Sequence, residues 1–548
     1  MCQVRIPICR GLRCHIRRLF FLIFCWVPIG YLFLYVIHLH ENGQYSESSN
    51  LGRGLLQQEP VDYVHETTVK TLNMELKIDK SVSMNEKDLL KMLSKDSNLP
   101  LSYFANWKSK KTNYKCLKYP SLYELDFNNV YWQRMTSPNA TFYLYGAYYD
   151  NRKQAGKVPM IRIIGMVDKI KPPPTYCQFW FDGLSKETIL ETGMYQRVSY
   201  TYMWFSKWGN HKDGILQPFI MSCKIPAAIN DSAVPVSVSL VSKLCEKPTN
   251  NLKVNHKVPQ KREDFAVCVK GLDFLYEDIS VRLVEWIELL NILGAQKIFF
   301  HEIEVHPNIS KVLSYYAKRG LVEVTPITLP GPQPNLPGFR HLYLKSKVVH
   351  KRQNELIPYN DCFYKNMYSY RYIALLDTDE VIMPLIHENW KDLMEEVIPD
   401  SLTTKNETKA SYNFRNVYFL DDLQDGKEMT HQIHEEGIPR YLHILQHVYR
   451  SENYTKPGSY VKCFHNADQV LSLHNHFPLN CLGRCYTHAV NTSLAHLQHY
   501  RKDCVGPLKK SCNEFRNHTV RDTSVWRFKD EVIRRTTEVL TNLEFFKF

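Results

Sequence analysis

The chain has 548 residues, of which 44% are hydrophobic and 13% aromatic, and its formal net charge is +13. This composition excludes an intrinsically disordered chain, and the length allows about two to four domains. Five arginines that precede the first acidic residue supply +5 of the charge, and no basic run is interleaved with aromatic residues, so no nucleic-acid partner is predicted.

An apolar span from Leu19 to Leu39 is long enough to cross a hydrocarbon core of about 30 Å as a helix. The arginines lie before it, so the positive-inside rule keeps residues 1–18 in the cytosol and sends the rest across the membrane. A cleaved signal peptide is the alternative, but no small-residue cleavage site follows the span. The sequence therefore predicts a type II anchor at residues 19–39 with a lumenal bulk.

Residues 40–100 are rich in Ser, Gln, Asn, Glu and Lys, which is typical of a stem. Residues 101–250 change to short β-rich runs separated by turn clusters, which predicts an antiparallel, sandwich-like accessory domain. Trp180, Trp204 and Trp208 in this region are either a sugar-stacking platform or core residues.

From residue 262 onward the periodicity becomes βαβ, which predicts a doubly wound, mostly parallel sheet. Predicted strands and helices alternate, in chain order, at 265–269, 278–293, 297–301, 308–319, 321–327, 343–365 and 372–376, and a helix at 525–543 closes the chain. A Pro/Gly-rich loop at 330–338 is expected to be a flexible lid.

The segment Tyr372–Leu376 is continuously apolar, which is typical of a strand buried on both faces. Asp377 and Asp379 follow directly at its carboxyl end, where open α/β sheets bind ligands. A solvated turn could also carry these residues. Charges beside a core are costly unless they are paired or bound to a metal, however, so this turn is the predicted organising site.

Seven glycosylation sequons and eleven cysteines follow the apolar span, which agrees with an oxidising lumen. A carboxyl-terminal cluster of cysteines lacks paired C-x-x-C units and favours disulfides over a zinc site. The cluster comprises Cys463, Cys481, Cys485, Cys504 and Cys512. The odd total predicts at least one thiol that is free or paired between chains.

Several motifs together resemble those of glycosyltransferase family 92. They are Tyr145–Arg152, Glu285-Trp286, Gln353 with Asn360–Cys362, Ile373–Pro384 and His499–Arg501. The resemblance runs from about Pro100 to the carboxyl terminus. It implies a GT-A fold at 262–548 with an Asp-x-Asp metal motif, in a Golgi enzyme. It also implies inverting transfer of galactose from UDP-galactose, with manganese, onto a glycan of a glycoprotein or polysaccharide, such as core fucose or a galactan chain.

Transfer from a nucleotide sugar requires stabilisation of the charge that develops on the leaving UDP, which a divalent cation provides as a Lewis acid. Mn²⁺, or Mg²⁺, suits carboxylate ligands, and Mn²⁺ accepts an added imidazole. Asp379 is the predicted direct ligand, and Asp377 is a ligand or a ribose partner. The third ligand that best fits the resemblance is His476, with His499 in reserve.

Lys270 and Arg501 join Asp377 as predicted donor-binding residues, because a guanidinium can clamp a diphosphate through two hydrogen bonds. Inversion also needs a carboxylate base that takes the acceptor proton. Four carboxylates after the metal strand are candidates, and the sequence does not choose among them. They are Asp421, Asp422, Glu435 and Glu436.

Two other classes of protein compete with this interpretation. The segment Leu375–Val381 also resembles the first motif of haloacid-dehalogenase-type phosphatases, with Asp377 as nucleophile and Asp379 as acid. Those enzymes carry the motif on their first strand, whereas three predicted strands precede it here. The other alternative is a membrane-anchored glycan-binding protein without catalysis.

Overall fold

The computed structural model describes residues 98–101, 116, 119–181, 195–226, 233–403, 407–424, 436–504 and 512–546. The predicted cytosolic tail, the anchor at 19–39 and nearly all of the stem lie outside these residues. Within them, no helix combines the length and the apolarity needed to traverse a bilayer. The described residues belong to one compact unit, Asn85–Phe548.

A seven-stranded sheet organises the carboxyl-terminal part, in the order β13-β12-β11-β14-β19-β16-β22. The first four strands are parallel to one another, β19 runs antiparallel to both of its neighbours, and β22 is parallel to β16. The sheet is therefore mostly parallel, as predicted. Its strands are β11 (Glu263–Phe274), β12 (Lys297–Val305), β13 (Val322–Pro326), β14 (Tyr370–Leu375), β16 (Ser411–Phe414), β19 (Lys462–Asn466) and β22 (Thr487–Ala489).

Helices cover both faces of this sheet, because its central strands are apolar on both sides. Phe265, Val267 and Val269 of β11 share one core with α6 (Ser280–Ile292), α7 (Pro307–Lys318) and α13 (Lys529–Asn542). Ala266 and Cys268 face the opposite core, which contains α9 (Val348–Asn366). The predicted βαβ alternation is thus confirmed, and chain order reverses between β11 and β14.

Smaller elements surround the main sheet. A three-stranded sheet, β15-β23-β17, follows the acidic turn and is formed by Glu380–Pro384, Ala495–Arg501 and Asn416–Leu420. Two separate antiparallel pairs are β18 (Tyr449–Ser451) with β24 (Thr519–Arg521), and the hairpin β20 (Val470–His474) with β21 (Phe477–Cys481). The remaining helices are α8 (Pro337–Ser346), α10 (Trp390–Thr403) and α12 (Cys512–Asn517), with 3-10 turns η5 (Asp421–Gln424) and η7 (Ser524–Phe528).

The β-rich region forms one ten-stranded path, β6-β5-β9-β10-β3-β4-β8-β7, with β1 and β2 added beside β3. Every pairing is antiparallel except that of β10 with β3. Cys177 of β5 and Cys223 of β8, far apart along this path, form a disulfide, so the sheet folds over a shared core. In chain order from β1 to β10, the strands are Phe127–Asn129, Trp132–Ser137, Ala140–Asp150, Met160–Val167, Tyr176–Trp180, Tyr195–Arg197, Ser199–Tyr202, Gln217–Lys224, Ser237–Val241 and Leu252–Asn255.

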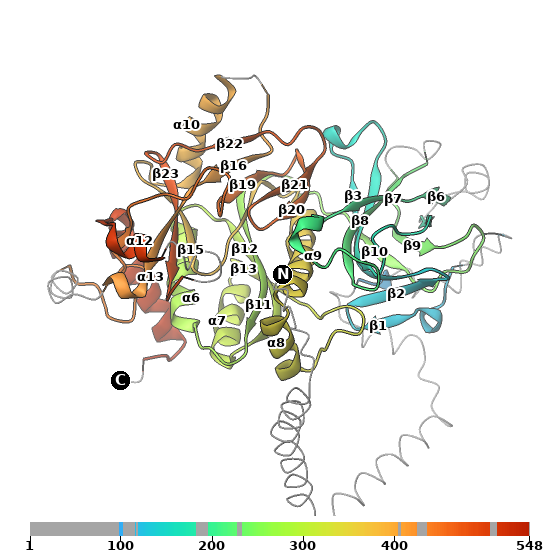
Figure 1. Cartoon of the computed structure of the whole chain (residues 1–548), viewed down its shortest axis with the longest axis horizontal. Coiled ribbons are helices and arrows are strands. Elements are labelled where there is room, and N and C mark those ends of the chain that lie inside the picture. The colour runs from blue at the N-terminus through green and yellow to red at the C-terminus, as the bar shows by residue number, and fades with distance from the viewer. Residues whose placement is uncertain are drawn as a thin grey trace, which may run out of the picture. The chain divides into compact units, whose positions relative to one another are not determined.

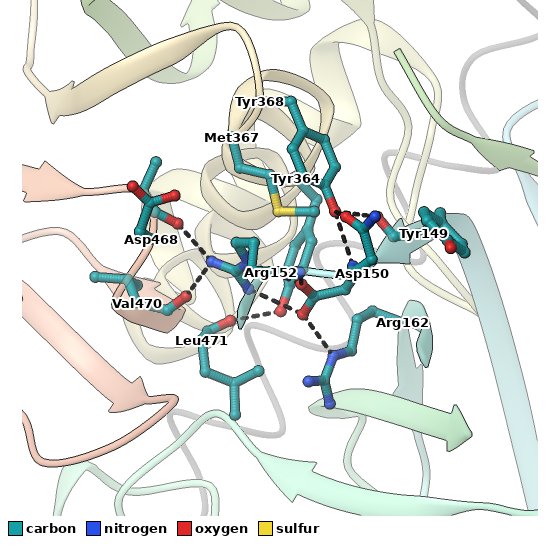
Figure 2. A network of polar contacts seen from close by, with 12 residues as sticks. Tyr149, Asp150, Arg152, Arg162, Tyr364, Met367, Tyr368, Asp468, Val470 and Leu471 are labelled. Carbon is teal, nitrogen blue, oxygen red and sulfur yellow. Dashed lines mark hydrogen bonds and ion pairs between the residues drawn. The ribbon is translucent and has the colours of Figure 1, made fainter. Parts of the chain in front are cut away.

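Helix α9 lies between the two large sheets and contacts β11 on one side and β3, β4 and β8 on the other (Figure 1). A buried polar network closes this junction (Figure 2). Arg152 pairs with Asp150 at 2.8 Å and donates to the carbonyls of Ala467 and Val470 at 2.6 and 2.7 Å. Arg162 approaches the second Asp150 oxygen at 3.0 Å. The Tyr145–Arg152 motif therefore joins the β-rich region to the α/β region.

The three tryptophans do not form a platform. Trp180 and Trp204 are buried, and their indoles donate to Ser239 and to the carbonyl of Gly209, so both belong to the core. Trp208 is half-buried and packs edge-on against Trp204, with 4.9 Å between the ring centroids. The alternative that the tryptophans are core residues is the correct one for the first two.

The Pro/Gly-rich loop at 330–338 is anchored rather than free. The amide of Gly331 donates to Asn128 at 2.7 Å, and Asn128 donates back to the Gly331 carbonyl at 3.3 Å. Asn335 bonds to both backbone groups of Leu329 at 2.8 Å. These bonds tie the loop to itself and to the β-rich region, so any lid movement of the loop would have to break them.

Disulfides account for most of the described cysteines. The pairs are Cys116–Cys245, Cys177–Cys223, Cys268–Cys362 and Cys481–Cys485, and Cys504 is also disulfide-bonded. The zinc alternative for the carboxyl-terminal cluster is wrong, because three of its members, Cys481, Cys485 and Cys504, are bonded to sulfur. Cys463 is a buried free thiol, as the odd cysteine count allows.

Candidate functional site

The acidic turn joins β14 to β15 and is held on all sides by hydrogen bonds. The amide of Asp377 donates to the Glu380 carboxylate at 2.9 Å, and the amide of Glu380 donates to the Asp377 carbonyl at 3.0 Å. The indole of Trp286, on α6, donates to the Glu380 carbonyl at 2.8 Å. The amide of Tyr500 donates to the Asp379 carbonyl at 2.8 Å. This turn is therefore a rigid, preorganised element.

Two lysines face the buried carboxylates of the turn. Lys270, from β11, lies 2.9 Å from one oxygen of Asp377, and Lys462, from β19, lies 3.6 Å from the other. Lys462 is completely buried and also contacts Glu380 at 2.9 Å. Burial alone would lower the pKa of Lys462, but Asp377 and Glu380 raise it above its usual value, so the ammonium stays charged.

Strand register brings His499 to the same turn. His499 on β23 pairs with Glu380 of β15 on one side and with Tyr418 of β17 on the other. Its Nε2 lies 3.3 Å from Asp379 Oδ2, and its Nδ1 lies 3.5 Å from Glu380 Oε1. The histidine predicted as the reserve ligand is thus the one that contacts Asp379.

His476 lies close to the turn but has a different partner. It occupies the connection between β20 and β21, and its Nδ1 lies 2.9 Å from the Val461 carbonyl. Burial and the charge of Lys462 lower the pKa of His476 to about 4, so the ring is neutral near neutral pH. Asp377 and His499 also act on it electrostatically, which places it at the edge of the same cluster.

The cluster carries unbalanced negative charge. When all three carboxylates are ionised, Asp377, Asp379 and Glu380 carry three negative charges against the two positive charges of Lys270 and Lys462; burial and the charge of Asp377 raise the pKa of Glu380. Burial resists ionisation, yet Lys270 and Lys462 hold the pKa of Asp377 well below its usual range, and His499 lowers that of Asp379. The remaining negative charge and the half-exposed Asp379 carboxylate beside an imidazole fit a divalent cation.

A cavity of about 560 Å³ opens next to this turn, at the carboxyl ends of β11 and β14 where chain order reverses. Its wall includes the predicted residues Lys270, Asp377, Asp379 and Arg501. The first turn of α6 also lines it, and helix amino termini favour anions. Side chains that the sequence did not single out complete the wall, among them Phe274, Glu277, Arg282, His443, Lys502 and Asp503.

None of the candidate bases that the structure describes lines the cavity. Asp421 contacts His443 and His447, Asp422 pairs with Arg516, and Glu436 pairs with Lys529. Glu435 lies outside the described residues. The carboxylates that do line the cavity, besides those of the turn, are Glu277 and Asp503.

Sequence reasoning missed Lys462 and Glu380 as members of the cluster. Glu380 adjoins the Asp-x-Asp motif, so its position was the available signal. Lys462 begins a short strand 82 residues later (462 − 380 = 82), and nothing local distinguishes it from a surface lysine. Only the pairing of β19 with β14 brings it to the turn.

The cavity is lined by both acidic and basic side chains and lies where the strand order of a mostly parallel sheet reverses. Doubly wound α/β proteins bind their ligands at this position. The family model described as "Glycosyltransferase family 92" matches residues 263–536, which is half of the chain (274 of 548). The chain therefore belongs to glycosyltransferase family 92, and it is a glycosyltransferase.

Similarity to individual proteins is slight. No curated protein matches the chain. Among solved structures, the chain is similar to the apo structure of WbbM, a bifunctional glycosyltransferase, with 8% sequence identity and a TM-score of 0.16. That alignment covers 40% of this chain and 35% of the other.

Proposed function

We propose that the protein is a metal-dependent, inverting galactosyltransferase with a GT-A fold, anchored in the Golgi membrane with its catalytic part in the lumen. It transfers galactose from UDP-galactose to a glycan acceptor and forms a β-linkage. The observation that carries this proposal is the acidic turn, with its excess negative charge, on the wall of a cavity that also presents basic side chains.

The side chains divide into two groups by their charge. Asp379 and His499 would hold Mn²⁺ or Mg²⁺, and Asp377 would support it from its position between two lysines. When bound, such a cation supplies Lewis-acid stabilisation of the diphosphate leaving group. Arg501 and Lys270 lie on the same wall and would bind phosphate oxygens of the donor.

The cavity also suits the rest of a nucleotide. Its volume of about 560 Å³ is within the usual range of small-molecule sites. Phe274 offers an apolar surface for a base, and the exposed carboxylate of Glu277 can accept hydrogen bonds from hydroxyl groups. Transfer with inversion additionally needs the carboxylate base, for which Asp421, Asp422, Glu435 and Glu436 remain the predicted candidates.

The test is transfer by the purified full-length protein in detergent, with a panel of UDP-sugars, a glycan array and added Mn²⁺. We expect UDP release and product formation with UDP-galactose, and loss of both in Asp379→Asn. Asp392→Asn is the matched control, because among the described residues the hydrogen bonds of this exposed aspartate on α10 are those with Asn389, directly before its own helix.

Three outcomes would contradict the proposal. Full activity in the presence of a strong chelator would exclude a role for a metal ion in the reaction. Glycan binding that survives Asp379→Asn, without any binding of UDP, would favour the non-catalytic glycan-binding protein. Phosphate release from simple esters would favour the phosphatase, although β14 is the fourth strand of its sheet in chain order, not the first.

A further inference from the structure

Outside the acidic turn, three potential metal ligands converge at a second place. Asp421 Oδ1 lies 3.0 Å from His447 Nε2 and 3.4 Å from His443 Nε2. One ligand atom from each of the three residues lies within 4.8 Å of the others. Both imidazoles are largely buried, and the carboxylate is about one-third exposed.

The backbone on both sides of this cluster is fixed. The buried carboxylate of Glu285 accepts hydrogen bonds from the amides of His443, Ile444 and Leu445 at 2.6 to 3.0 Å. On the other side, Gln424 ends the turn that begins at Asp421 and bonds to the backbone of residues 448 and 449 at 2.6 to 3.0 Å. The three side chains are thus held in place by groups that belong to none of them, as in preorganised metal sites.

The hydrogen bonding of His447 decides how its ring can face Asp421. Its Nδ1 lies 2.6 Å from the His443 carbonyl, and because a carbonyl can only accept, Nδ1 carries a proton. In the neutral ring Nε2 then carries no proton, and its lone pair is directed at Asp421 Oδ1, a carboxylate oxygen 3.0 Å away. Two acceptors do not attract each other, so this contact requires either a proton or a metal cation between the two atoms.

The distances fit a shared cation. Zinc binds histidine nitrogen and carboxylate oxygen at about 2.0–2.2 Å, so two ligand atoms of a tetrahedral site lie roughly 3.3–3.5 Å apart. The contacts of 3.0 and 3.4 Å around Asp421 Oδ1 are close to this separation. The second ring nitrogen of His447, Nδ1, donates to a backbone carbonyl, and this is the usual way in which the ring of a zinc-binding histidine is oriented.

We propose that Asp421, His443 and His447 bind a single Zn²⁺ ion, separate from the cation proposed for the acidic turn, which removes Asp421 from the candidate bases. Two imidazoles and one carboxylate are ligands that zinc accepts, whereas the carboxylate-rich turn suits Mn²⁺ or Mg²⁺. His443 also lines the cavity, so the ion lies behind its wall and joins the end of β17 to the segment at 443–447. Three protein ligands leave a fourth position for water.

The test measures zinc in the purified full-length protein after dialysis against a weak chelator. We expect one zinc per chain in the wild type and in Asp379→Asn, which removes the other metal site. His447→Ala and Asp421→Asn each remove a proposed ligand, so each should weaken zinc binding by more than the roughly 10- to 100-fold that loss of an outer-shell partner costs. Asp422→Asn is the matched control and should retain zinc, because this adjacent carboxylate pairs with Arg516.

Co²⁺ provides a second readout that needs no variant to fold. Substituted into the wild type, it should give the visible absorption of a tetrahedral site with nitrogen and oxygen ligands, and added Zn²⁺ should abolish the signal. A wild type that binds no zinc and gives no such spectrum would overturn the proposal and leave an imidazolium at His447. Unchanged zinc affinity in a folded His443→Gln or His447→Ala protein would overturn it equally.

Discussion

The indole nitrogen of Trp286 donates a 2.8 Å hydrogen bond to the main-chain carbonyl of Glu380, and both residues are buried. The residue before it, Glu285, accepts the three amides of the segment at 443–445. Two consecutive residues of α6 therefore hold the acidic turn and the segment at 443–445, both of which contribute residues to the cavity wall. This pair is part of the family resemblance, and its role is to support the site rather than to contact substrate.

Replacing Trp286 by Phe should reduce transfer. The change leaves the Glu380 carbonyl without its buried donor, which should cost about 1–3 kcal/mol of unfolding free energy. Denaturant unfolding and kcat/KM for the sugar donor are the measurements. Trp390→Phe is the control, because Trp390 makes the same 2.8 Å bond to Ile382, further along β15. Equal losses of activity in both variants would show that the turn needs no support of its own.

Removing Lys462 should destabilise the protein strongly. Lys462→Met leaves Glu380 without its ammonium partner and Asp377 with only Lys270, and breaking a buried ion pair costs about 3–5 kcal/mol. The free energy of unfolding from denaturant titration measures this. Adding Glu380→Gln to Lys462→Met should recover part of the loss, since it removes the stranded charge. A double variant no more stable than the single one would contradict this account of the pair.

The junction between the two sheets should depend on Arg152. Arg152→Met leaves Asp150 with Arg162 as its remaining guanidinium partner and frees two buried carbonyls, so we expect a loss of about 3–5 kcal/mol. Arg134→Met removes a partly exposed pair with Asp126 and should cost at most about 1 kcal/mol. Similar unfolding free energies for the two variants would argue against the network as the link between the regions.

His465 should make the protein acid-sensitive. The side chain is completely buried, neither ring nitrogen has a hydrogen-bond partner among the described residues, and burial together with Lys462 lowers its pKa from 6.5 to about 3. Between pH 6.5 and about 3, His465 therefore binds a proton in the unfolded chain but not in the folded chain. Stability is full above pH 6.5 and falls between pH 6.5 and about 3, by at most about 5 kcal/mol from this group.

The measurement is the unfolding free energy of the wild type and of His465→Phe from about pH 7 down to the lowest pH at which both proteins stay folded. The variant should lose less stability over this interval, because its side chain does not titrate. Other buried histidines contribute to both proteins, so only the difference between the two curves reports on His465. Parallel curves would mean that this ring is not the source of the acid sensitivity.

The sequence predicted the features that follow from local pattern. The apolar segment before Asp377, the alternating elements from residue 262 and the position of the acidic turn all agree with the structure. His499 and Lys462 reach the turn through strand pairings that span about 120 and 90 residues, and no local signal specifies such pairings. Several motif residues of the resemblance proved to be buried supports, as Arg152 and Asn360 illustrate.

The arrangement on α6 has a consequence for how the enzyme can change. Neighbouring residues of a helix point about 100° apart, so Glu285 and Trp286 reach two different walls from a single turn. Inserting or deleting one residue ahead of them would rotate both away from their partners at once. Variation in what the cavity binds is therefore expected in the loops that the helix braces and in side chains of α6 that line the cavity, such as Arg282, while the phase of the helix itself stays unchanged.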